Sequence, residues 1–224
     1  FINSIPLRYN NNTSYNTSRR HLNVLVNYLH ENGFDIDKSK LKTRKQEEVL
    51  HKPIKHVKTL LDDIYKFNRN LHLCCLMTYC CLLRPHQEIR LLKWSDFNDD
   101  LSYLSLSGSR VKSKRNRHVP VPIIVRKLLV RDDQNINIFS SKEQPYNKDY
   151  FKTLFRRFKR VNPQVDKGVT LYSFRHSGAI EIYKRTGSLS KLQTAMGHSS
   201  LNVSLTYLRG LEVAELEESD MPMI

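Results

Sequence analysis

The chain has 224 residues, of which 26% are charged, and its formal net charge at pH 7 is +15. Residues 211–224 hold five acidic and no basic side chains, so the first 210 residues carry 37 basic against 17 acidic groups. This excess favours a polyanionic partner, because phosphate contacts release condensed counterions. The absence of any run of 18 apolar residues excludes a membrane-spanning helix. A basic protein without a nucleic-acid partner is the alternative that charge alone leaves open.

The first predicted helix begins near Ser18, after a stretch rich in Asn, Ser and Thr that shows no periodicity. Asn32-Gly33 supplies its C-terminal stop, and its apolar face consists of Leu22, Leu25, Val26 and Leu29. Residues 35–52 are charged and almost free of large apolar groups, which predicts an interdomain linker.

Two further helices are predicted before a break in the chain. Pro53 starts the first of them, and residues 71–83 are almost wholly apolar, which predicts a buried helix. Arg84-Pro85 interrupts that buried helix, because a residue before proline is pushed out of the α region. A short helix then runs to Trp94.

The four cysteines form two adjacent pairs, Cys74-Cys75 and Cys80-Cys81, inside the apolar segment. Neighbouring cysteines suit neither a disulfide framework nor the CxxC spacing of zinc sites, so no metal site is predicted. Buried, reduced cysteines are instead typical of a cytoplasmic protein, which is the predicted location.

Residues 101–123 differ from the helical segments before them. Apolar and polar residues alternate on both sides of Ser107-Gly108-Ser109, which predicts a small antiparallel sheet with a basic loop. From about Asn147 onward the apolar spacing is helical again, and neither a repeat nor βαβ alternation occurs. The predicted fold class is mainly α with a small antiparallel β-sheet, an α+β fold.

Two stretches are crowded with basic residues. The first lies on the predicted strand–turn–strand and comprises Arg110, Lys112, Lys114, Arg115 and Arg117. The second shares a helix with the apolar Phe151, Leu154, Phe155 and Phe158 and comprises Lys152, Arg156, Arg157, Lys159 and Arg160. The helical spacing of the aromatic residues predicts that they belong to the core rather than to a base-stacking platform. A solvated basic face is the alternative, but cations crowded at a hairpin tip repel one another unless an anion is bound. We therefore predict DNA contact through Arg110, Lys114, Arg115, Arg117, Arg156 and Arg157.

Three local patterns, each weak alone, together resemble the tyrosine recombinase family. The first is Leu83-Arg84-Pro85-His86-Gln87-Glu88-Ile89 with Trp94-Ser95-Asp96 behind it, which is similar to the family's first arginine box. The second is Leu171-Tyr172-Ser173-Phe174-Arg175-His176-Ser177, which is similar to the box where His-x-x-Arg places the second arginine. The third is Met196-Gly197-His198-Ser199-Ser200 with Tyr207 nine residues after the histidine, which is similar to the Leu-Gly-His box and the nucleophilic tyrosine. Lys112 stands where the family has its β-hairpin lysine, with Lys114 and Arg110 as alternatives.

The resemblance implies a division of the chain into three parts. Residues 1–45 correspond to the C-terminal part of a helical core-binding domain, which clamps DNA, and its linker. Residues 46–210 correspond to the tyrosine recombinase catalytic domain. The acidic tail, residues 211–224, resembles a segment that packs onto a neighbouring protomer in relatives, with a frayed terminus as the alternative.

The resemblance also implies a function. The chain is expected to be a site-specific DNA recombinase or integrase that cleaves and rejoins strands through a covalent phosphotyrosine at Tyr207. Its expected partners are double-stranded DNA, further copies of the chain in a tetramer on DNA and, in some systems, accessory DNA-bending proteins. Two alternatives remain: a topoisomerase-like enzyme that nicks and reseals one strand, and a DNA-binding regulator that has lost catalysis.

The expected chemistry explains why these residue types should converge. In-line attack on a phosphodiester builds negative charge on the phosphate oxygens, which the forked donors of Arg84 and Arg175 would hold. We expect Ser173 to cap the helix, so that Arg175 lies in its first turn, where free N–H groups also favour an anion. Tyr207 is the expected nucleophile on a helix over residues 201–208, away from a buried stripe of Leu201, Leu205 and Leu208. Lys112 would protonate the leaving sugar oxygen, and His198 would donate a hydrogen bond to the phosphate or assist proton transfer. No metal and no other cofactor is expected, because the arginines supply the charge.

Two departures from the family pattern stand out. Tyr172 occupies the place of the usual histidine in the second box, and a phenol can donate a hydrogen bond but cannot become cationic. Glu88 follows Arg84 by four residues where three is typical, which leaves its role as a partner of Arg84 open. Similar Tyr-Ser-Phe-Arg-His boxes occur in integrases of mobile elements from Bacteroides-type bacteria, which is the expected kind of source.

Overall fold

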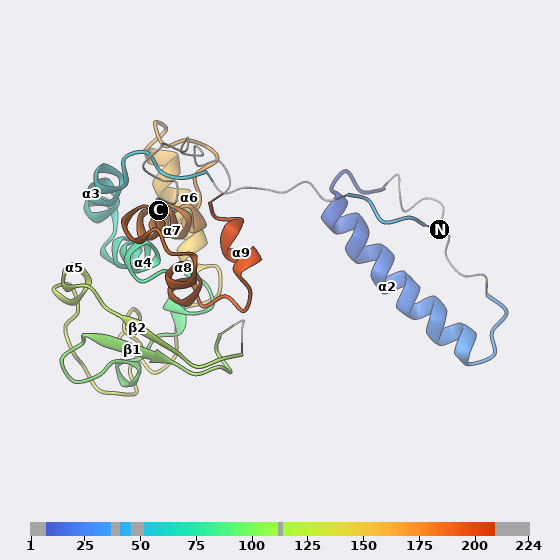
Figure 1. Ribbon diagram of the computed structural model, residues 1–224, viewed down its shortest axis with the longest axis horizontal. Coiled ribbons are helices and arrows are strands. Elements are labelled where there is room, and N and C mark those ends of the chain that lie inside the picture. Colours follow the sequence, from blue (N-terminus) through green and yellow to red (C-terminus); the bar gives the residue numbers. More distant parts are fainter. Residues whose placement is uncertain (1–7, 37–40, 46–51, 112–113, 209–224) are drawn as a thin grey trace, which may run out of the picture. The chain divides into compact units, whose positions relative to one another are not determined.

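The computed structural model describes residues 8–36, 41–45, 52–111 and 114–208. The chain divides into two compact units, an N-terminal unit of residues 1–49 and a C-terminal unit of residues 50–224 (Figure 1). No helix of the described ranges combines the length and the apolar character that a membrane span requires.

The N-terminal unit is built on α2 (Asn12–Glu31). The side chain of Asn11 accepts hydrogen bonds from the amides of Thr13 and Ser14 at 2.8 and 3.1 Å, and this cap starts the helix six residues before the predicted Ser18. Residues 41–45 run along α2, and the hydroxyl of Tyr15 donates to the carbonyl of Lys42 at 3.0 Å. The polar residues of the first turns thus hold a neighbouring segment.

The C-terminal unit begins with two helices, α3 (Val57–Phe67) and α4 (Arg69–Cys80), joined at Asn68. Asn68 ends α3, and its side-chain oxygen accepts from the amide of Leu71 at 2.9 Å, which caps α4. The first helix starts at Val57 rather than at Pro53, because the amide of Ile54 donates to the Ser177 hydroxyl at 2.8 Å and ties that segment to another part of the unit.

The predicted buried helix is confirmed in α4, but it ends at Cys80, three residues before the predicted end. The chain turns at Leu82, whose φ of 51° lies in the left-handed region, before it reaches Arg84. The short helix predicted up to Trp94 is replaced by a turn and two 3-10 helices, η2 (Ile89–Leu91) and η3 (Trp94–Asp96). A longer helix does not form, because the Trp94 amide donates to the carbonyl of Ile136 at 3.1 Å and not to a carbonyl within a helix.

The predicted antiparallel sheet is confirmed as a two-stranded hairpin of β1 (Tyr103–Leu106) and β2 (Arg117–Pro120). Leu104 pairs with Val119, and both side chains are buried while their neighbours along each strand are exposed. Figure 1 shows the hairpin at one side of the helices. The short helix α5 (Ile123–Arg126) follows.

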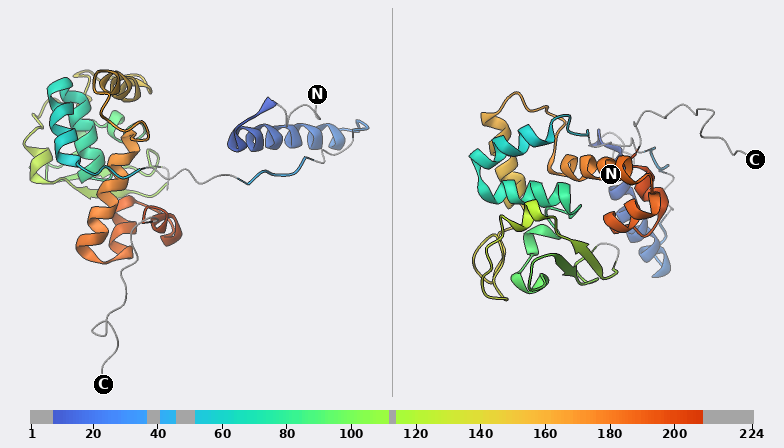
Figure 2. Two further views of the ribbon diagram at one scale, coloured as in Figure 1. Left: turned by 90° about the horizontal axis from the view of Figure 1, so that it is seen from above. Right: turned by 60° about the vertical axis from the view of Figure 1, so that its left-hand side comes forward.

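Four helices complete the C-terminal unit: α6 (Tyr150–Val161), α7 (Leu171–Thr186), α8 (Leu189–Met196) and α9 (Leu201–Leu205). Figure 2 shows α7, α8 and α9, in orange to red, grouped together. On α6 the rings of Phe151, Phe155 and Phe158 are buried, which confirms that these aromatics belong to the core.

Helices α4 and α7 pack against each other in the centre of this unit (Figure 1). The contact requires Gly178, because a Cβ on this residue would collide with the backbone carbonyl of Tyr79 and would lie 2.8 Å from Cδ2 of Leu82. Cys74, Cys75 and Cys81 are buried and free, as predicted, whereas Cys80 is free but only partly buried. The mainly α fold class with a small antiparallel sheet is confirmed.

Candidate active site

A cleft of about 420 Å³ brings together residues from all three boxes. It is lined by Arg84 and Gln87 of the first box, Tyr172 of the second, and Gly197, His198 and Ser199 of the third, with Val203 and Tyr207 from α9 and the turn after it. Four of the six predicted catalytic residues therefore share one cavity.

Arg84 is held in the cleft by Glu88. The Arg84 guanidinium donates to Oε1 of Glu88 at 2.5 Å, and the Arg84 amide donates to Oε2 at 2.8 Å. The Glu88 side chain is fully buried, and that of Arg84 is 11% exposed. The four-residue spacing therefore still forms a charge-assisted pair, because residues 85–88 form a turn that folds the carboxylate back onto Arg84.

Arg175 lies behind the cleft and is fully buried. Its Nη2 donates to the carbonyl of Met196 at 2.7 Å, while Nε and Nη1 have no hydrogen-bond partner among the residues that the structure describes. Burial lowers the pKa of Arg175, and the nearby charge of Arg84 lowers it further, whereas Tyr207 and Glu88 act in the opposite direction. The second arginine thus lies close to the first and to the predicted nucleophile.

The predicted cap of α7 is wrong. The helix starts at Leu171 with Thr170 as its N-cap, and the amide of Thr170 donates to the hydroxyl of Ser173 at 3.0 Å. Ser173 is thus the third residue of the helix. It completes a capping box with Thr170 and is not the cap itself. Arg175 consequently lies in the second turn, where the argument from free N–H groups does not apply.

Tyr207 lies in a turn just after α9, which ends at Leu205 instead of extending to residue 208. The predicted buried stripe is wrong for Leu201 and Leu205, which are 43% and 42% exposed, while Leu208 is partly buried. The buried side chain of this helix is that of Ser204. The ring of Tyr207 is half-buried, with its centre 5.4 Å from the ring of His198 and 5.6 Å from the ring of His176. It both lines the cleft and packs against a small apolar cluster around Leu82.

His198 is oriented by Ser204. Its Nδ1 lies 3.0 Å from the hydroxyl of Ser204, and its carbonyl accepts from the side chain of Gln193 at 3.2 Å. Gly197, which precedes His198, has a φ of 64° and ends α8 in the left-handed conformation that favours glycine.

The residues predicted to contact DNA differ in their surroundings. Lys112 lies outside the described residues, while Lys114 and Arg115 beside it are exposed, as are Arg156 and Arg157 on α6. Arg110 donates to Asp96 at 2.6 Å and to the carbonyl of Leu91 at 2.7 Å. Arg117 is 7% exposed and points into the protein, so the structure does not bring it to the surface with the others.

Comparisons with known proteins give the family of this chain. A profile of the phage integrase family matches residues 46–212, which is well over half of the chain. The chain belongs to the phage integrase family. A search of curated protein sequences finds no match.

Several solved structures share the fold of this phage integrase family member. A lambda integrase dimer bound to a COC′ core site is 18% identical with a TM-score of 0.72, over 92% of this chain and 77% of that one. The Tn1549 transposon integrase in complex with a circular intermediate DNA is 14% identical with a TM-score of 0.69, over 98% and 80%. The XerH site-specific recombinase bound to its difH substrate is 19% identical with a TM-score of 0.67, over 93% and 65%. The predicted integrase or recombinase function is thereby confirmed at the level of the family, while the roles of individual residues stay predictions.

Tyr172 is the residue in which this phage integrase family member departs most from the expected boxes. Its ring centre lies 6.3 Å from the ring of His86, and its side chain is half-buried in the cleft. Burial raises the pKa of Tyr172, and although Arg84 and Arg175 lower it, the net direction is upward. Tyr172 therefore remains a neutral phenol that can donate a hydrogen bond.

The sequence patterns missed Ser204, and they left the partner of Arg84 undecided. Ser204 lies six residues after His198 and three before Tyr207, but a serine in a short helix carries no signal of its own. The signal for Glu88 was present, since a carboxylate one helical turn from an arginine is a common pairing. Only the turn after Arg84 shows that the pair forms without a helix.

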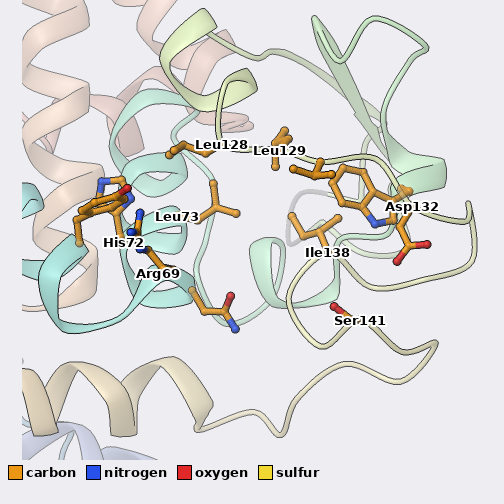
Figure 3. Close-up of a pocket in the computed structure, with 12 residues that line it drawn as sticks. Arg69, His72, Leu73, Leu128, Leu129, Asp132, Ile138 and Ser141 are labelled. Carbon is orange, nitrogen blue, oxygen red and sulfur yellow. The ribbon is translucent and has the colours of Figure 1, made fainter.

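Two of the other hollows differ from this cleft in their lining. One of about 350 Å³, drawn in Figure 3, is lined by Arg69, His72 and Leu73 of α4 and by the segment from Leu128 to Asp132, and none of its residues was predicted to be catalytic. The other adjoins the first box and is strongly basic. It contains Arg90, Arg110, Lys148 and Lys152 with the single carboxylate of Asp149.

Proposed function

We propose that this chain is a site-specific DNA recombinase or integrase that cleaves and rejoins DNA through a covalent bond between phosphorus and the Tyr207 oxygen. The observation that carries the proposal is the single cleft in which Tyr207 lies beside Arg84, Tyr172 and His198, with Arg175 buried behind them.

The reaction balances without an external energy source. The Tyr207 oxygen attacks the phosphorus and forms a new P–O bond, while the bond from phosphorus to the leaving sugar oxygen breaks. The phenol loses its proton and the sugar oxygen gains one, which leaves one phosphodiester as before. A sugar hydroxyl can then attack the phosphotyrosine and release Tyr207, which rejoins a strand.

Arg84 and Arg175 are proposed to hold the charged phosphate oxygens. Their guanidinium groups present several forked donors each, and their neighbours hold them in place before substrate binds. Donors fixed in advance stabilise developing charge without reorganisation, which is usually the largest catalytic contribution. The Nε and Nη1 donors of Arg175, which have no hydrogen-bond partner within the described part of the chain, are consistent with this role.

Proton transfer is assigned to Lys112 and His198, with Tyr172 beside them as a hydrogen-bond donor. Lys112 lies outside the described residues, and its role as the acid for the leaving oxygen rests on its position in the sequence and on the family resemblance. His198 is held by Ser204 at the wall of the cleft, and Tyr172 contributes a neutral hydroxyl. We therefore propose that Tyr172 donates a hydrogen bond to the phosphate and leaves the proton transfer to the other two.

Double-stranded DNA is the proposed partner. The exposed cations Lys114, Arg115, Arg156 and Arg157 support this, as does the basic hollow next to Arg84, whereas buried Arg117 is not included. By analogy with the family, residues 1–45 are proposed to belong to a DNA-clamping domain. The chain is proposed to assemble on DNA as a homotetramer. The proposed location is the cytoplasm. The acidic tail that would contact a neighbouring protomer lies outside the described residues.

The covalent bond can be tested by trapping it. The protein is incubated with a library of duplexes that have a randomised central segment and staggered nicks, so that the short strand released by cleavage diffuses away. A protein–DNA adduct that survives denaturant is expected from the wild type and not from Tyr207→Phe. An equal yield from Tyr207→Phe, or none from the wild type, would contradict the proposal.

A second assay separates recombination from nicking and resealing. Two differently labelled duplexes are mixed with the protein. Both carry a sequence recovered from the adducts that the library forms. Recombination produces hybrid duplexes that carry both labels, whereas a topoisomerase-like enzyme returns only the parental molecules.

A further inference from the structure

Arg117 on β2 is a buried cation that the proposed chemistry does not use. Its side chain is 6% exposed, and its Nη1 lies 3.3 Å from Oε2 of Glu88. Its Nη2 donates to the carbonyls of Cys81 and Leu82 at 3.4 and 3.3 Å, and also to the carbonyl of Ala195. One guanidinium thus connects the hairpin, the end of α4, the first box and the end of α8.

Two of these connections end next to proposed catalytic residues. Glu88, which Arg117 contacts, accepts both the side-chain and the main-chain hydrogen bonds of Arg84. Ala195 is followed by Met196, whose carbonyl accepts from Arg175. Gly197 comes next and leads into His198, and a Cβ on Gly197 would lie 2.9 Å from Cδ of Arg117. The Arg117 side chain therefore lies directly against the segment that carries the third box.

The charge of this cluster is costly to bury. Three guanidinium groups, those of Arg84, Arg117 and Arg175, are close enough to affect one another, and Glu88 is the carboxylate between them. Burial lowers the pKa of Arg117 to about 10, and Arg175 and Arg84 contribute in the same direction while Glu88 opposes them. A fold selected for stability alone gains little from such a cluster, because a well-packed apolar group is often at least as stable as a buried ion pair.

We propose that Arg117 is a positioning residue that aligns the two phosphate-binding arginines and His198 before DNA binds. It acts on Arg84 through Glu88, and on Arg175 and His198 through the segment from Ala195 to Gly197. Arg117 is not among the residues that line the cleft, so it reaches the phosphate only through these neighbours. The inference rests on the proposed function, in which the two arginines hold the scissile phosphate.

Two variants of Arg117 test the proposal. Arg117→Lys keeps the charge, but a single ammonium cannot reach Glu88 and three carbonyls at once. Arg117→Gln removes one of the three mutually repelling charges and keeps an amide that can donate to a carbonyl. Arg131 provides a matched control, because it also donates to several carbonyls, those of Phe97, Asn98 and Asp99, and does not line the cleft.

The readout is the rate of adduct formation at saturating DNA, normalised to the folded fraction measured by circular dichroism. A misplacement of about 1 Å can cost a factor of about 100 in rate. We therefore expect both Arg117 variants to slow adduct formation by about 10- to 100-fold, with DNA affinity changed by less than about threefold. Arg131→Gln should leave the normalised rate unchanged.

A second substrate separates positioning from general damage. In DNA with a methylphosphonate at the scissile position, a methyl group replaces one charged phosphate oxygen. The rate of cleavage should then depend less on the charges of Arg84 and Arg175. If Arg117 acts through Arg84 and Arg175, the loss caused by its variants should shrink on this substrate, and so should the loss caused by Arg84→Ala. Losses that are equal on both substrates, or that merely follow the folded fraction, would overturn the inference. Failure of the proposed function itself looks different, because the wild type would then form no adduct on either substrate.

Discussion

At the scale of single residues, the site depends on how each side chain is held rather than on its type alone. Arg175 is fully buried and fixed by the carbonyl of Met196, whereas Arg185 on the same helix is exposed. The same residue type thus serves as a preorganised donor at one position and as a solvated charge at the other.

Arg175→Lys is expected to slow adduct formation by about 10²- to 10³-fold, because the ammonium keeps the charge but loses the forked donors. The rate is measured in a single turnover on the trapping substrate. Arg185→Lys is the matched control and should leave this rate unchanged. A similar rate for Arg175→Lys and the wild type would show that the fork is not required.

Tyr172 gives a prediction that depends on pH. Because burial raises its pKa above the usual phenol value, Tyr172 keeps its proton throughout the neutral range and contributes no titration there. In Tyr172→His the imidazole, with a reference pKa of about 6.5, becomes cationic as the pH falls and then stabilises the phosphate charge. The ratio of the Tyr172→His rate to the wild-type rate should therefore rise between about pH 8 and pH 5.5.

Tyr172→Phe is the control for this experiment, since it has no titratable group at this position. Its rate relative to the wild type should be constant across the same pH range. A constant ratio for Tyr172→His would mean that the group at position 172 does not face the phosphate.

At the scale of elements, the contact between α4 and α7 sets where the second box lies relative to the first. Arg84 follows the end of α4, and Arg175 lies on α7 three residues before Gly178. Since Gly178 permits the close approach of the two helices, it also determines the separation of the two arginines.

Gly178→Ala should destabilise the protein by about 1–3 kcal/mol, because the added methyl group meets a backbone carbonyl that cannot move aside. The free energy of unfolding is measured in urea through the fluorescence of Trp94, the single tryptophan. Gly168→Ala is the matched control, since its new Cβ would meet the flexible side chain of Lys52, and it should change stability by less than about 1 kcal/mol. An unchanged unfolding midpoint for Gly178→Ala would show that the two helices can separate freely.

At the scale of the whole molecule, the excess of basic residues is divided between the surface and the interior. On α6, Arg156 and Arg157 are exposed while the aromatic residues of the same helix are buried. On β2, by contrast, Arg117 is buried and pairs with Glu88. Net charge therefore predicts the kind of partner but not which cations reach it.

Replacing Arg156 and Arg157 together by Gln should weaken DNA binding and make it less sensitive to salt. The slope of log K against log salt concentration should become shallower by up to about 2, since each lost phosphate contact removes about 0.9. The slope is measured by fluorescence anisotropy over a series of salt concentrations. The double substitution of Lys58 and Lys66 on α3 by Gln removes the same charge elsewhere. An equal change in both proteins would indicate a general field effect and no direct contact by α6.

The amino-acid sequence by itself determined the fold class and the order of the boxes, and the resemblance of those boxes to the tyrosine recombinase family gave Tyr207 as the candidate nucleophile. These features are local: helical spacing, the hairpin between two apolar strands and a histidine nine residues before a tyrosine can all be read along the chain. Helix ends were less predictable, because caps such as Asn11 and Thr170 compete with equally polar neighbours.

The tertiary structure alone decided which charges are buried and which groups hold the side chains that we propose to be catalytic. Arg117 looked like its exposed neighbours Lys114 and Arg115, and Ser204 like any serine in a short helix. Their roles depend on Glu88 and on the end of α8 for Arg117, and on His198 for Ser204. Whether a long charged side chain is solvated or buried is decided by what packs across from it, and for Arg117 those partners lie 29 to 78 residues away in the chain.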